Sequence, residues 1–273
     1  MIATPIGNLE DITLRALRLL GEVALVAAED TRHTRKLLTH FNISKPLISY
    51  YKQKENIRAG QIIEKLAAGE DVALVSDAGT PGISDPGAIL VEKTVKAGYR
   101  VVPVPGPSAL SCALSVSGFG QTAVLFLGFL PSRKGERKKV LKQHVADDSC
   151  LAFYESPRRI KNSLQECLEI LEDRQVCLAR ELTKIHEEIL HGRLIDVAAE
   201  LQGRKEIKGE FVVILAGAEK DITAPDSGDV QELLTWFRDQ TDLSLKDAVK
   251  KVSRDLGLRR SDIYQQALEL WNR

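Results

Sequence analysis

Short apolar segments alternate over the first 218 residues with segments whose apolar positions recur at helical spacing. Apolar runs of four to eight residues predict buried strands, and apolar residues three and four apart predict helices. Gly69 and Gly98 stand where a glycine ends a helix. The predicted strands are 23–28, 72–76, 101–104, 124–129, 151–154, 176–179 and 211–216, and the predicted helices are 14–20, 57–68, 88–97, 160–171 and 195–201. This alternation predicts an α/β fold.

Changes in the pattern divide the chain further. Gly118 and Gly120 interrupt it before the strand predicted at 124, which predicts a boundary between two α/β domains. A later stretch rich in Asp, Ser, Pro and Gly has the composition of a linker. Three helical patterns follow it and predict a small helix-turn-helix-like module. The predicted parts are domains 1–117 and 118–218, a linker at 219–228 and the module at 229–273.

Composition narrows the function classes. The 38 basic and 38 acidic residues give a formal net charge of zero, so any surface for a polyanion must be a local patch. The four cysteines form no C-x-x-C pair and the histidines show no metal-ligand spacing, so we expect no metal and a reducing cytoplasm. The longest apolar runs fall short of the roughly 20 residues that span a bilayer, so we expect no membrane association.

Three loops rich in glycine and proline follow predicted strands. They are the first loop (residues 3–8), the second loop (76–87) and the third loop (103–109). Proline fixes a backbone torsion and glycine lets a ligand approach the backbone, so their alternation indicates backbone groups aimed at a ligand rather than simple turns. None of the loops matches a triphosphate-binding or dinucleotide-binding glycine motif. We therefore expect neither a nucleoside triphosphate nor NAD.

Individual side chains in these loops have two interpretations. Asp77 stands at the carboxyl end of a strand, where α/β sheets place ligand-binding groups, and its carboxylate can accept from ribose hydroxyls or bind an ammonium. Asp77 and Asp85 can instead cap local turns or the helix that begins near Pro86. Ser108 is placed to cap a helix, and the same helix start offers free backbone donors to a ligand.

Specific motifs spread over nearly the whole chain carry a family resemblance. They read ATPIGNLEDITLRAL, AAEDTRHTRKLL, SDAGTPGISDPG, PGPSA, FLGFLP, FYESPRR, ARELTKIHEE, KGEFVVIL and GLRRSDIYQQAL. The sequence resembles the family of small-subunit ribosomal RNA methyltransferases I, a branch of the tetrapyrrole methylases. The resemblance implies two α/β domains with a cofactor in the cleft between them and a small helical module. Family members carry more apolar residues before ATPIGN, so we expect a shortened first strand.

The resemblance also implies an activity. It is 2′-O-methylation of the ribose of a decoding-centre cytidine in 16S ribosomal RNA, with S-adenosylmethionine as cofactor and no metal. The implied partners are 16S rRNA or the small ribosomal subunit and a second copy of the chain, in the cytoplasm. The implied cofactor contacts are Pro5, Ile6, Gly7, Asp77, Gly79, Ile83, Ser108 and Ala109.

Methylation of a hydroxyl requires a group that accepts its proton. We rank Glu155 and Glu181 first because each directly follows a predicted strand. Lys184 qualifies if burial lowers its pKa. The alternative is that Glu155 and Glu181 form structural ion pairs with neighbouring cations. Further carboxylates in matching motifs are Glu29, Asp30, Glu187 and Glu188.

Contacts to RNA phosphates are expected from local basic runs, because guanidinium groups suit phosphate oxygens. The same runs can be solvated helix faces. Arg259 and Arg260 in the helical module make its role in RNA binding a hypothesis only. Other functions stay open: methylation of a tetrapyrrole or a protein side chain, and non-catalytic binding to the ribosome. The predicted RNA contacts are Arg32, Arg35, Arg133, Lys134, Arg137, Lys138, Arg158 and Arg159.

Overall fold

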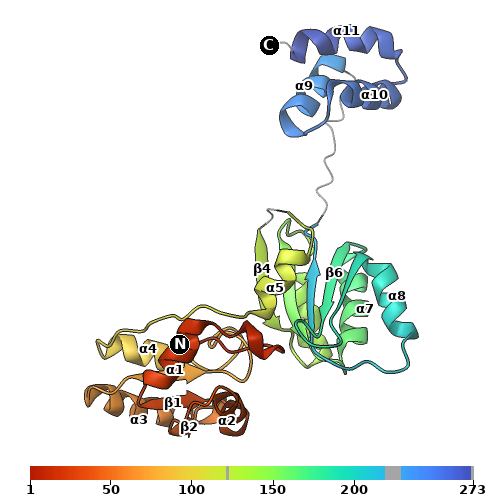
Figure 1. Cartoon of the computed structure of the whole chain (residues 1–273). Helices are drawn as coiled ribbons and strands as arrows, with labels where there is room; N and C mark the ends of the chain where they lie inside the picture. Colours follow the sequence, from red (N-terminus) through yellow and green to blue (C-terminus); the bar gives the residue numbers. More distant parts are fainter. Residues whose placement is uncertain (121–122, 219–228, 272–273) are drawn as a thin grey trace. The chain divides into compact units, whose positions relative to one another are not determined.

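The computed structural model describes residues 1–120, 123–218 and 229–271. Contacts group the chain into two units, an α/β unit (Met1–Glu219) and a helical module (Lys220–Arg273). The α/β unit consists of two lobes, each built on its own sheet (Figure 1). The predicted linker at 219–228 lies outside the described residues, and the division at 117/118 stays a prediction.

The first lobe holds a parallel three-stranded sheet in the order β2-β1-β3. Its strands are β1 (Leu25–Ala28), β2 (Leu47–Ser49) and β3 (Val72–Val75), and its helices are α1 (Leu14–Glu22), α2 (Thr31–His40), α3 (Glu55–Ala67) and α4 (Ala88–Lys96). The predicted strands at 23–28 and 72–76 are confirmed. The three residues of β2 are too few to show a period, so the sequence pattern did not reveal this strand.

The strand predicted at 101–104 is wrong. Only Val104 pairs there, in an isolated bridge with Ile2. Met1–Thr4 runs between β3 and this segment: the amide of Ile2 donates to Leu74 O at 2.9 Å, and the amide of Val104 donates to Met1 O at 2.9 Å. Pro103 and Pro105 lack an amide donor, and this prevents a continuous ladder on either side of Val104.

The second lobe holds a five-stranded sheet in the order β4-β5-β8-β6-β7, in which only β4 and β5 are parallel. Leu151 and Phe153 belong to one hydrophobic cluster, and Cys150 and Ala152 belong to another. Both faces of the sheet are therefore covered, which explains why β5 is apolar at consecutive positions. The strands are β4 (Val124–Phe129), β5 (Cys150–Glu155), β6 (Gln175–Arg180), β7 (Glu188–Arg193) and β8 (Phe211–Leu215).

Helices cover the two faces of this sheet unequally. One face packs on α6 (Lys134–Lys142), α7 (Ile160–Leu171) and α8 (Leu194–Gly203), and the other on α5 (Ala109–Val116). Figure 1 shows α7 and α8 on one side of the sheet and α5 on the other. Ala113 of α5 is fully buried against Cys150 and Ala152. By packing, α5 thus lies with the second sheet, although the sequence-based division assigned it to the first domain. Ser108 caps this helix, as predicted.

The helical module consists of α9 (Val230–Gln240), α10 (Leu245–Leu256) and α11 (Arg260–Trp271). Leu234, Phe237 and Val252 are buried in its core. Ser244 caps the start of α10, and Gly257 ends that helix in the left-handed conformation. None of the helices described in either unit is long and apolar enough to cross a membrane.

Candidate active site

A cavity of about 420 Å³ lies in the α/β unit where the three glycine-rich and proline-rich loops meet the second sheet. Ile6, Gly79 and Ser108 reach it from the first, second and third loops, and Phe129 and Tyr154 reach it from β4 and β5. Its volume falls within the range of roughly 300 to 1,000 Å³ typical of small-molecule sites. We call it the cleft cavity.

Hydrogen bonds hold the three loops together. Thr4 and Gly79 exchange backbone hydrogen bonds of 2.9 and 3.0 Å, and the Thr80 hydroxyl donates to Pro107 O at 3.1 Å. Gly79 has a φ of 83°, and a Cβ at this position would lie 3.4 Å from Ile6 Cγ2. A glycine therefore stands where the first and second loops touch and the backbone turns left-handed.

Two contacts join the lobes beside the cavity. The amide of Asn8 donates to Thr183 Oγ1 at 3.1 Å, and a Cβ built on Gly128 would lie 3.1 Å from Ser84 Oγ. Thr183 and Ser84 have φ values of 65° and 67°, a backbone conformation that residues other than glycine rarely adopt. Backbone strain of this kind persists where the surrounding structure enforces it, often at functional sites. The two lobes are therefore in contact beside the cavity.

Three carboxylates of the first lobe line the cavity: Glu29, Asp77 and Asp85, here called the cavity acids. Burial raises the pKa of Asp85 to about 6, and the charges of Glu29 and Asp77 add to this shift. Burial and the charge of Asp77 also raise the pKa of Glu29. The amide of Asp30 donates to Asp77 Oδ1 at 2.9 Å. None of the cavity acids forms an ion pair with a residue that the structure describes.

The donor set of the cavity fits S-adenosylmethionine. This cofactor carries a sulfonium and an ammonium, and the cavity acids supply uncompensated negative charge for a cation. Ile6, Ile83 and Leu182 provide apolar wall for an adenine ring. Among the described residues, no group of His, Cys, Asp or Glu has an arrangement that would hold a metal ion.

Most of the predicted cofactor contacts line the cavity, and two do not. Pro5 is buried and Gly7 is exposed, and neither lines the cavity. A Cβ on Gly7 would collide with the side chain of Lys184, so this glycine permits the contact between lobes rather than an open approach to the cavity. The predicted contacts that do line the cavity are Ile6, Asp77, Gly79, Ile83, Ser108 and Ala109.

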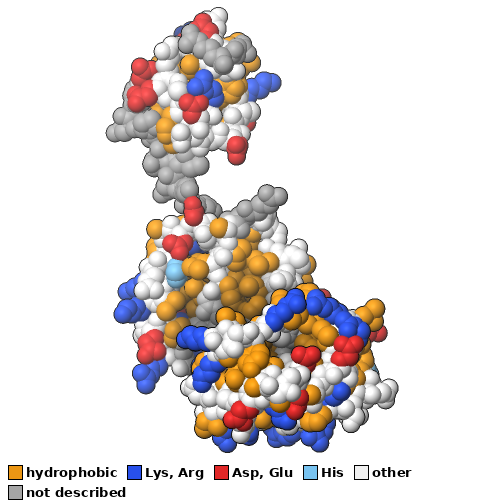
Figure 2. Space-filling model, turned by 90° about the vertical axis from the view of Figure 1, so that its left-hand side faces the viewer, with side chains coloured by type: hydrophobic (Ala, Val, Ile, Leu, Met, Phe, Trp, Pro, Cys, Tyr) orange, Lys and Arg blue, Asp and Glu red, His pale blue; other side chains and the backbone are white. Residues whose placement is uncertain are grey.

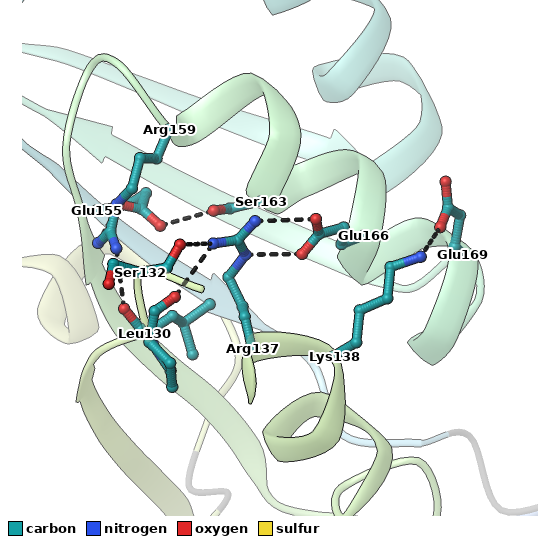
Figure 3. Close-up of polar contacts among 10 residues, drawn as sticks. Leu130, Ser132, Arg137, Lys138, Glu155, Arg159, Ser163, Glu166 and Glu169 are labelled. Carbon is teal, nitrogen blue, oxygen red and sulfur yellow. Dashed lines mark hydrogen bonds and ion pairs between the residues drawn. The ribbon is translucent and has the colours of Figure 1, made fainter. Parts of the chain in front are cut away.

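Glu155 lines the cavity but is committed to hydrogen bonds within the protein (Figure 3). Its Oε1 accepts from the amide of Ser156 and from the Arg159 guanidinium, each at 2.7 Å, and its Oε2 accepts from the Ser163 hydroxyl at 2.6 Å. The side chain is fully buried. These contacts support the ion-pair alternative and leave Glu155 poorly placed to accept a substrate proton.

Glu181 and Lys184 pair with each other. Lys184 Nζ donates to Glu181 Oε1 at 2.8 Å and to Glu210 Oε2 at 3.0 Å. Burial alone would lower the pKa of Lys184, but these hydrogen bonds outweigh it, and the net shift is upward. The condition under which Lys184 was expected to accept a proton is therefore not met. For Glu181, burial is likewise outweighed by the bonds from Lys184 and the Glu210 amide, and its pKa is lowered.

The structure contradicts the prediction that Arg137 contacts RNA, whereas the RNA contact of Arg159, whose side chain is 26% exposed and paired with Glu155, stays a prediction. Arg137 is 5% exposed and forms a bidentate pair with Glu166, at 2.7 and 2.9 Å. Its remaining nitrogen donates to Pro131 O and Ser132 O, and Arg159 donates to Leu130 O in the same loop (Figure 3). Both guanidinium groups therefore hold the loop after β4, and Arg137 does so while buried. A basic run in the sequence does not distinguish a buried arginine from an exposed one.

The other predicted RNA contacts are exposed, apart from Lys138, which pairs with Glu169 at 2.7 Å. Each follows a cavity-lining segment along the chain: Arg32 and Arg35 come after Glu29, Arg133 and Lys134 after Phe129, and Arg158 after Pro157. Arg32 pairs with Asp30, yet its side chain is 87% exposed. We call this set the rim cations (Arg32, Arg35, Arg133, Lys134 and Arg158).

Sequence reasoning missed several cavity residues. Asp85 was interpreted only as a local cap, although it shares the second loop with Asp77. Phe129 and Tyr154 lie at the ends of adjacent parallel strands, where their rings meet at 5.4 Å. The rule that ligands bind at the carboxyl ends of strands would have indicated both aromatic residues. The pKa of Asp85 is raised first by burial and then by the charges of Glu29 and Asp77, which follow β1 and β3, and this combination has no signature in the sequence.

Comparison with known proteins gives matches over both units. The family Tetrapyrrole (Corrin/Porphyrin) Methylases matches residues 1–198, and the RsmI C-terminal HTH domain matches residues 224–270. The Ribosomal RNA small subunit methyltransferase I of Halalkalibacterium halodurans is 42% identical over 97% of this chain and 92% of its own length. That of Thermotoga maritima is 46% identical over 80% of this chain and 98% of its own.

Solved structures share the fold of the α/β unit. The methyltransferase CobJ aligns with a TM-score of 0.58 at 20% identity, over 78% of this chain and 90% of its own. A uroporphyrin-III C-methyl transferase from Thermus thermophilus, solved with S-adenyl homocysteine, aligns with a TM-score of 0.54 at 22% identity. It covers 79% of this chain and 95% of its own. At this level of identity the likeness shows the fold and not the substrate.

Proposed function

This chain belongs to the tetrapyrrole methylase family, within the group of small-subunit ribosomal RNA methyltransferases I, and on this premise we propose that it methylates ribosomal RNA with S-adenosylmethionine. The cleft cavity is the observation that carries the proposal. Three loops, held together by hydrogen bonds, and the end of β1 present carboxylates without an ion-pair partner among the described residues, together with apolar wall, in one space of about 420 Å³. A sulfonium cofactor needs this combination of charge and shape.

When bound, S-adenosylmethionine supplies an electrophilic methyl group. The residues of this chain must hold the cofactor, position the nucleophile and remove its proton. Backbone groups around Gly79 and at the capped start of α5, beside Ser108, offer fixed hydrogen-bond partners. Asp77 keeps its orientation through the Asp30 amide, which leaves its second oxygen for a cofactor hydroxyl or ammonium. The loops of the first lobe and the start of α5 thus serve the methyl donor.

We assign proton acceptance to Asp85. A general base works best when its pKa lies near the operating pH, and the pKa of Asp85 is raised to about 6. This carboxylate lines the cavity on the side facing Tyr154, whose own pKa is raised by burial and partly by the charge of Asp85. Glu155 and Glu181 are occupied by cations, so they are weaker candidates for this step.

The rim cations support RNA as the acceptor. They follow the ends of β1, β4 and β5, the strands whose carboxyl ends border the cavity. Phosphate contacts from such positions fix the register of a nucleic acid without reading its bases. Because the net charge of the chain is zero, this local placement carries the electrostatic argument. The relatives named as ribosomal RNA methyltransferases agree with it.

The finer assignment comes from the family. We propose that the acceptor is the 2′-hydroxyl of a decoding-centre cytidine in 16S rRNA. We also propose a homodimer in the cytoplasm. Figure 2 shows a broad apolar area on the α/β unit, and exposed apolar side chains on α5 and β4 include Val116, Val124 and Phe129. Apolar area of this kind marks an interaction surface, and light scattering of the purified protein tests for the dimer.

The test of the proposal is methylation in vitro. The purified chain is incubated with methyl-labelled S-adenosylmethionine and small ribosomal subunits from cells that lack the gene, and the RNA is mapped by mass spectrometry. We expect one new ribose methyl group on a 16S cytidine. Label on a protein would support the side-chain alternative. No transfer to subunits or to free 16S rRNA, despite cofactor binding, would reject RNA as the acceptor.

A further inference from the structure

The helical module carries a row of cations on α10. Lys246, Lys250 and Arg254 are spaced four residues apart and all three are exposed, so they lie along one face of the helix. We call this row the α10 stripe. Successive members are separated by about 6 Å along the helix axis, because each residue rises about 1.5 Å. A repeat of this kind suits a phosphate backbone rather than a single anion.

Most cations of this surface are not neutralised within the protein. Lys246 and Lys250 form no ion pair with any residue that the structure describes, and the same holds for Arg259 and Arg260 at the start of α11. Arg254 pairs only with the adjacent Asp255, at 3.2 Å, with 77% of its side chain exposed. The module therefore holds a basic surface although its overall charge is balanced.

Two other acidic residues, one in α10 and one in α11, are engaged locally. Asp247 accepts from the Ser244 hydroxyl that caps α10, and Asp262 accepts from the Ser261 hydroxyl in the first turn of α11. Their charges are directed to the starts of helices, where the helix dipole favours them. They do not form pairs with the α10 stripe.

The geometry next to the stripe is that of a helix-turn-helix. Leu256 ends α10, Gly257 adopts a φ of 67°, and Arg260 begins α11 after a turn of three residues. The Ser253 hydroxyl donates to Leu258 O at 2.7 Å and fixes this turn. In nucleic-acid-binding proteins of this kind, the second helix presents its first residues to the groove while the first helix lies near the backbone.

We propose that the helical module binds ribosomal RNA, with the α10 stripe and the Arg259–Arg260 pair contacting phosphates. The exposed polar side chains of α11, Ser261 and Gln265, then face the RNA beside those contacts. This inference rests on the proposed function, because it takes the methylation substrate as the ligand. It gives the module a positioning role: it adds affinity for RNA without touching the cofactor.

The test uses the full chain and the small subunits of the methylation assay. Each phosphate contact contributes to the slope of log K against log salt concentration, by roughly 0.7 to 0.9 per contact. Replacing the α10 stripe with alanine (K246A/K250A/R254A) should lower the magnitude of this slope by about two and weaken binding at least tenfold at about 0.1 M salt. Affinity for S-adenosylmethionine should not change, since the cleft cavity lies in the α/β unit.

A matched variant controls for net charge. R18A/K65A/K96A removes three exposed cations from the α/β unit, each already paired with a glutamate. This variant should keep the wild-type slope. The inference is overturned if the stripe variant retains wild-type slope and affinity, or if the control loses as much. Those results differ from failure of the proposed function, in which wild-type protein neither binds nor methylates the subunits.

Discussion

Two groups of carboxylates in the α/β unit differ in what surrounds them. The cavity acids have no cationic partner among the described residues, and the pKa of both Glu29 and Asp85 is raised. In the second group, Glu155 at the end of β5 and Glu166 in α7 are buried and bound by Arg159 and Arg137 (Figure 3). Pairing identifies the second group as structural. An unpaired acid in a cavity holds its charge at a cost, and a bound cation would relieve that cost.

The largest expected effect comes from breaking the buried ion pair between Arg137 and Glu166. Arg137→Ala removes the partner of Glu166, whose side chain is 5% exposed, and leaves a buried charge uncompensated. We expect unfolding free energy, measured by urea denaturation, to fall by about 4 kcal/mol. The loop at Pro131 and Ser132 also loses its donor.

Two further variants delimit this effect. Lys138→Ala breaks the more exposed pair with Glu169 and should cost less than about 1 kcal/mol. The double variant R137M/E166L replaces the buried pair with apolar groups and should recover most of the stability. A loss as large in the double variant as in Arg137→Ala would mean that the loop contacts, not the charge, are responsible.

The next largest effect concerns Asp85, one of the cavity acids. Asp85→Asn keeps the shape of the side chain but cannot accept a proton from a hydroxyl. We expect methylation in single-turnover assays to fall about a hundredfold, at the low end for removal of a general base, with cofactor affinity within a few-fold of wild type. Glu210→Gln changes a carboxylate that also lines the cavity but is 80% exposed, and it should have little effect. Equal losses in both variants would refute the assignment of Asp85.

A smaller effect follows from pH. Because the raised pKa of Asp85 is about 6, the group is protonated and inactive below that value and ionised above it. The logarithm of kcat/KM should therefore rise with unit slope up to about pH 6 and level off at higher pH. Glu29→Gln removes a neighbouring charge that helps to raise this pKa, so it should move the inflection to lower pH. An unchanged inflection in that variant would mean that the pH dependence does not come from Asp85.

The sequence predicted some elements of the fold and missed others. The strands β1, β3 and most of the second sheet were predicted because both of their faces are buried, which makes each of them a continuous apolar run in the sequence. The polar edge strand β7 has no such run, and β2 is too short to show one. The loops were located because glycine and proline have local causes, such as the positive φ of Gly79.

The roles of charged side chains were harder to predict. Glu155 and Asp85 both follow strands or loops at the cavity, and only their neighbours in space distinguish them. Arg159 and Ser163 follow Glu155 by four and eight residues, so both partners of Glu155 are close to it in the sequence, at the start of α7. The pKa of Asp85 is raised by burial and by the charge of Glu29, which is 56 residues away in the sequence. No periodic pattern in the sequence indicates an interaction of this kind.

The most direct test of the central claim is calorimetric titration of S-adenosylmethionine into the wild-type chain and into Asp77→Asn. Asparagine retains the oxygen that accepts from the Asp30 amide but removes one charge of the cavity acids. The account predicts one cofactor per chain for the wild type, at least tenfold weaker binding for the variant, and equal unfolding free energies. Wild-type protein that binds no cofactor, or a variant that binds it as tightly as the wild type, would contradict the account.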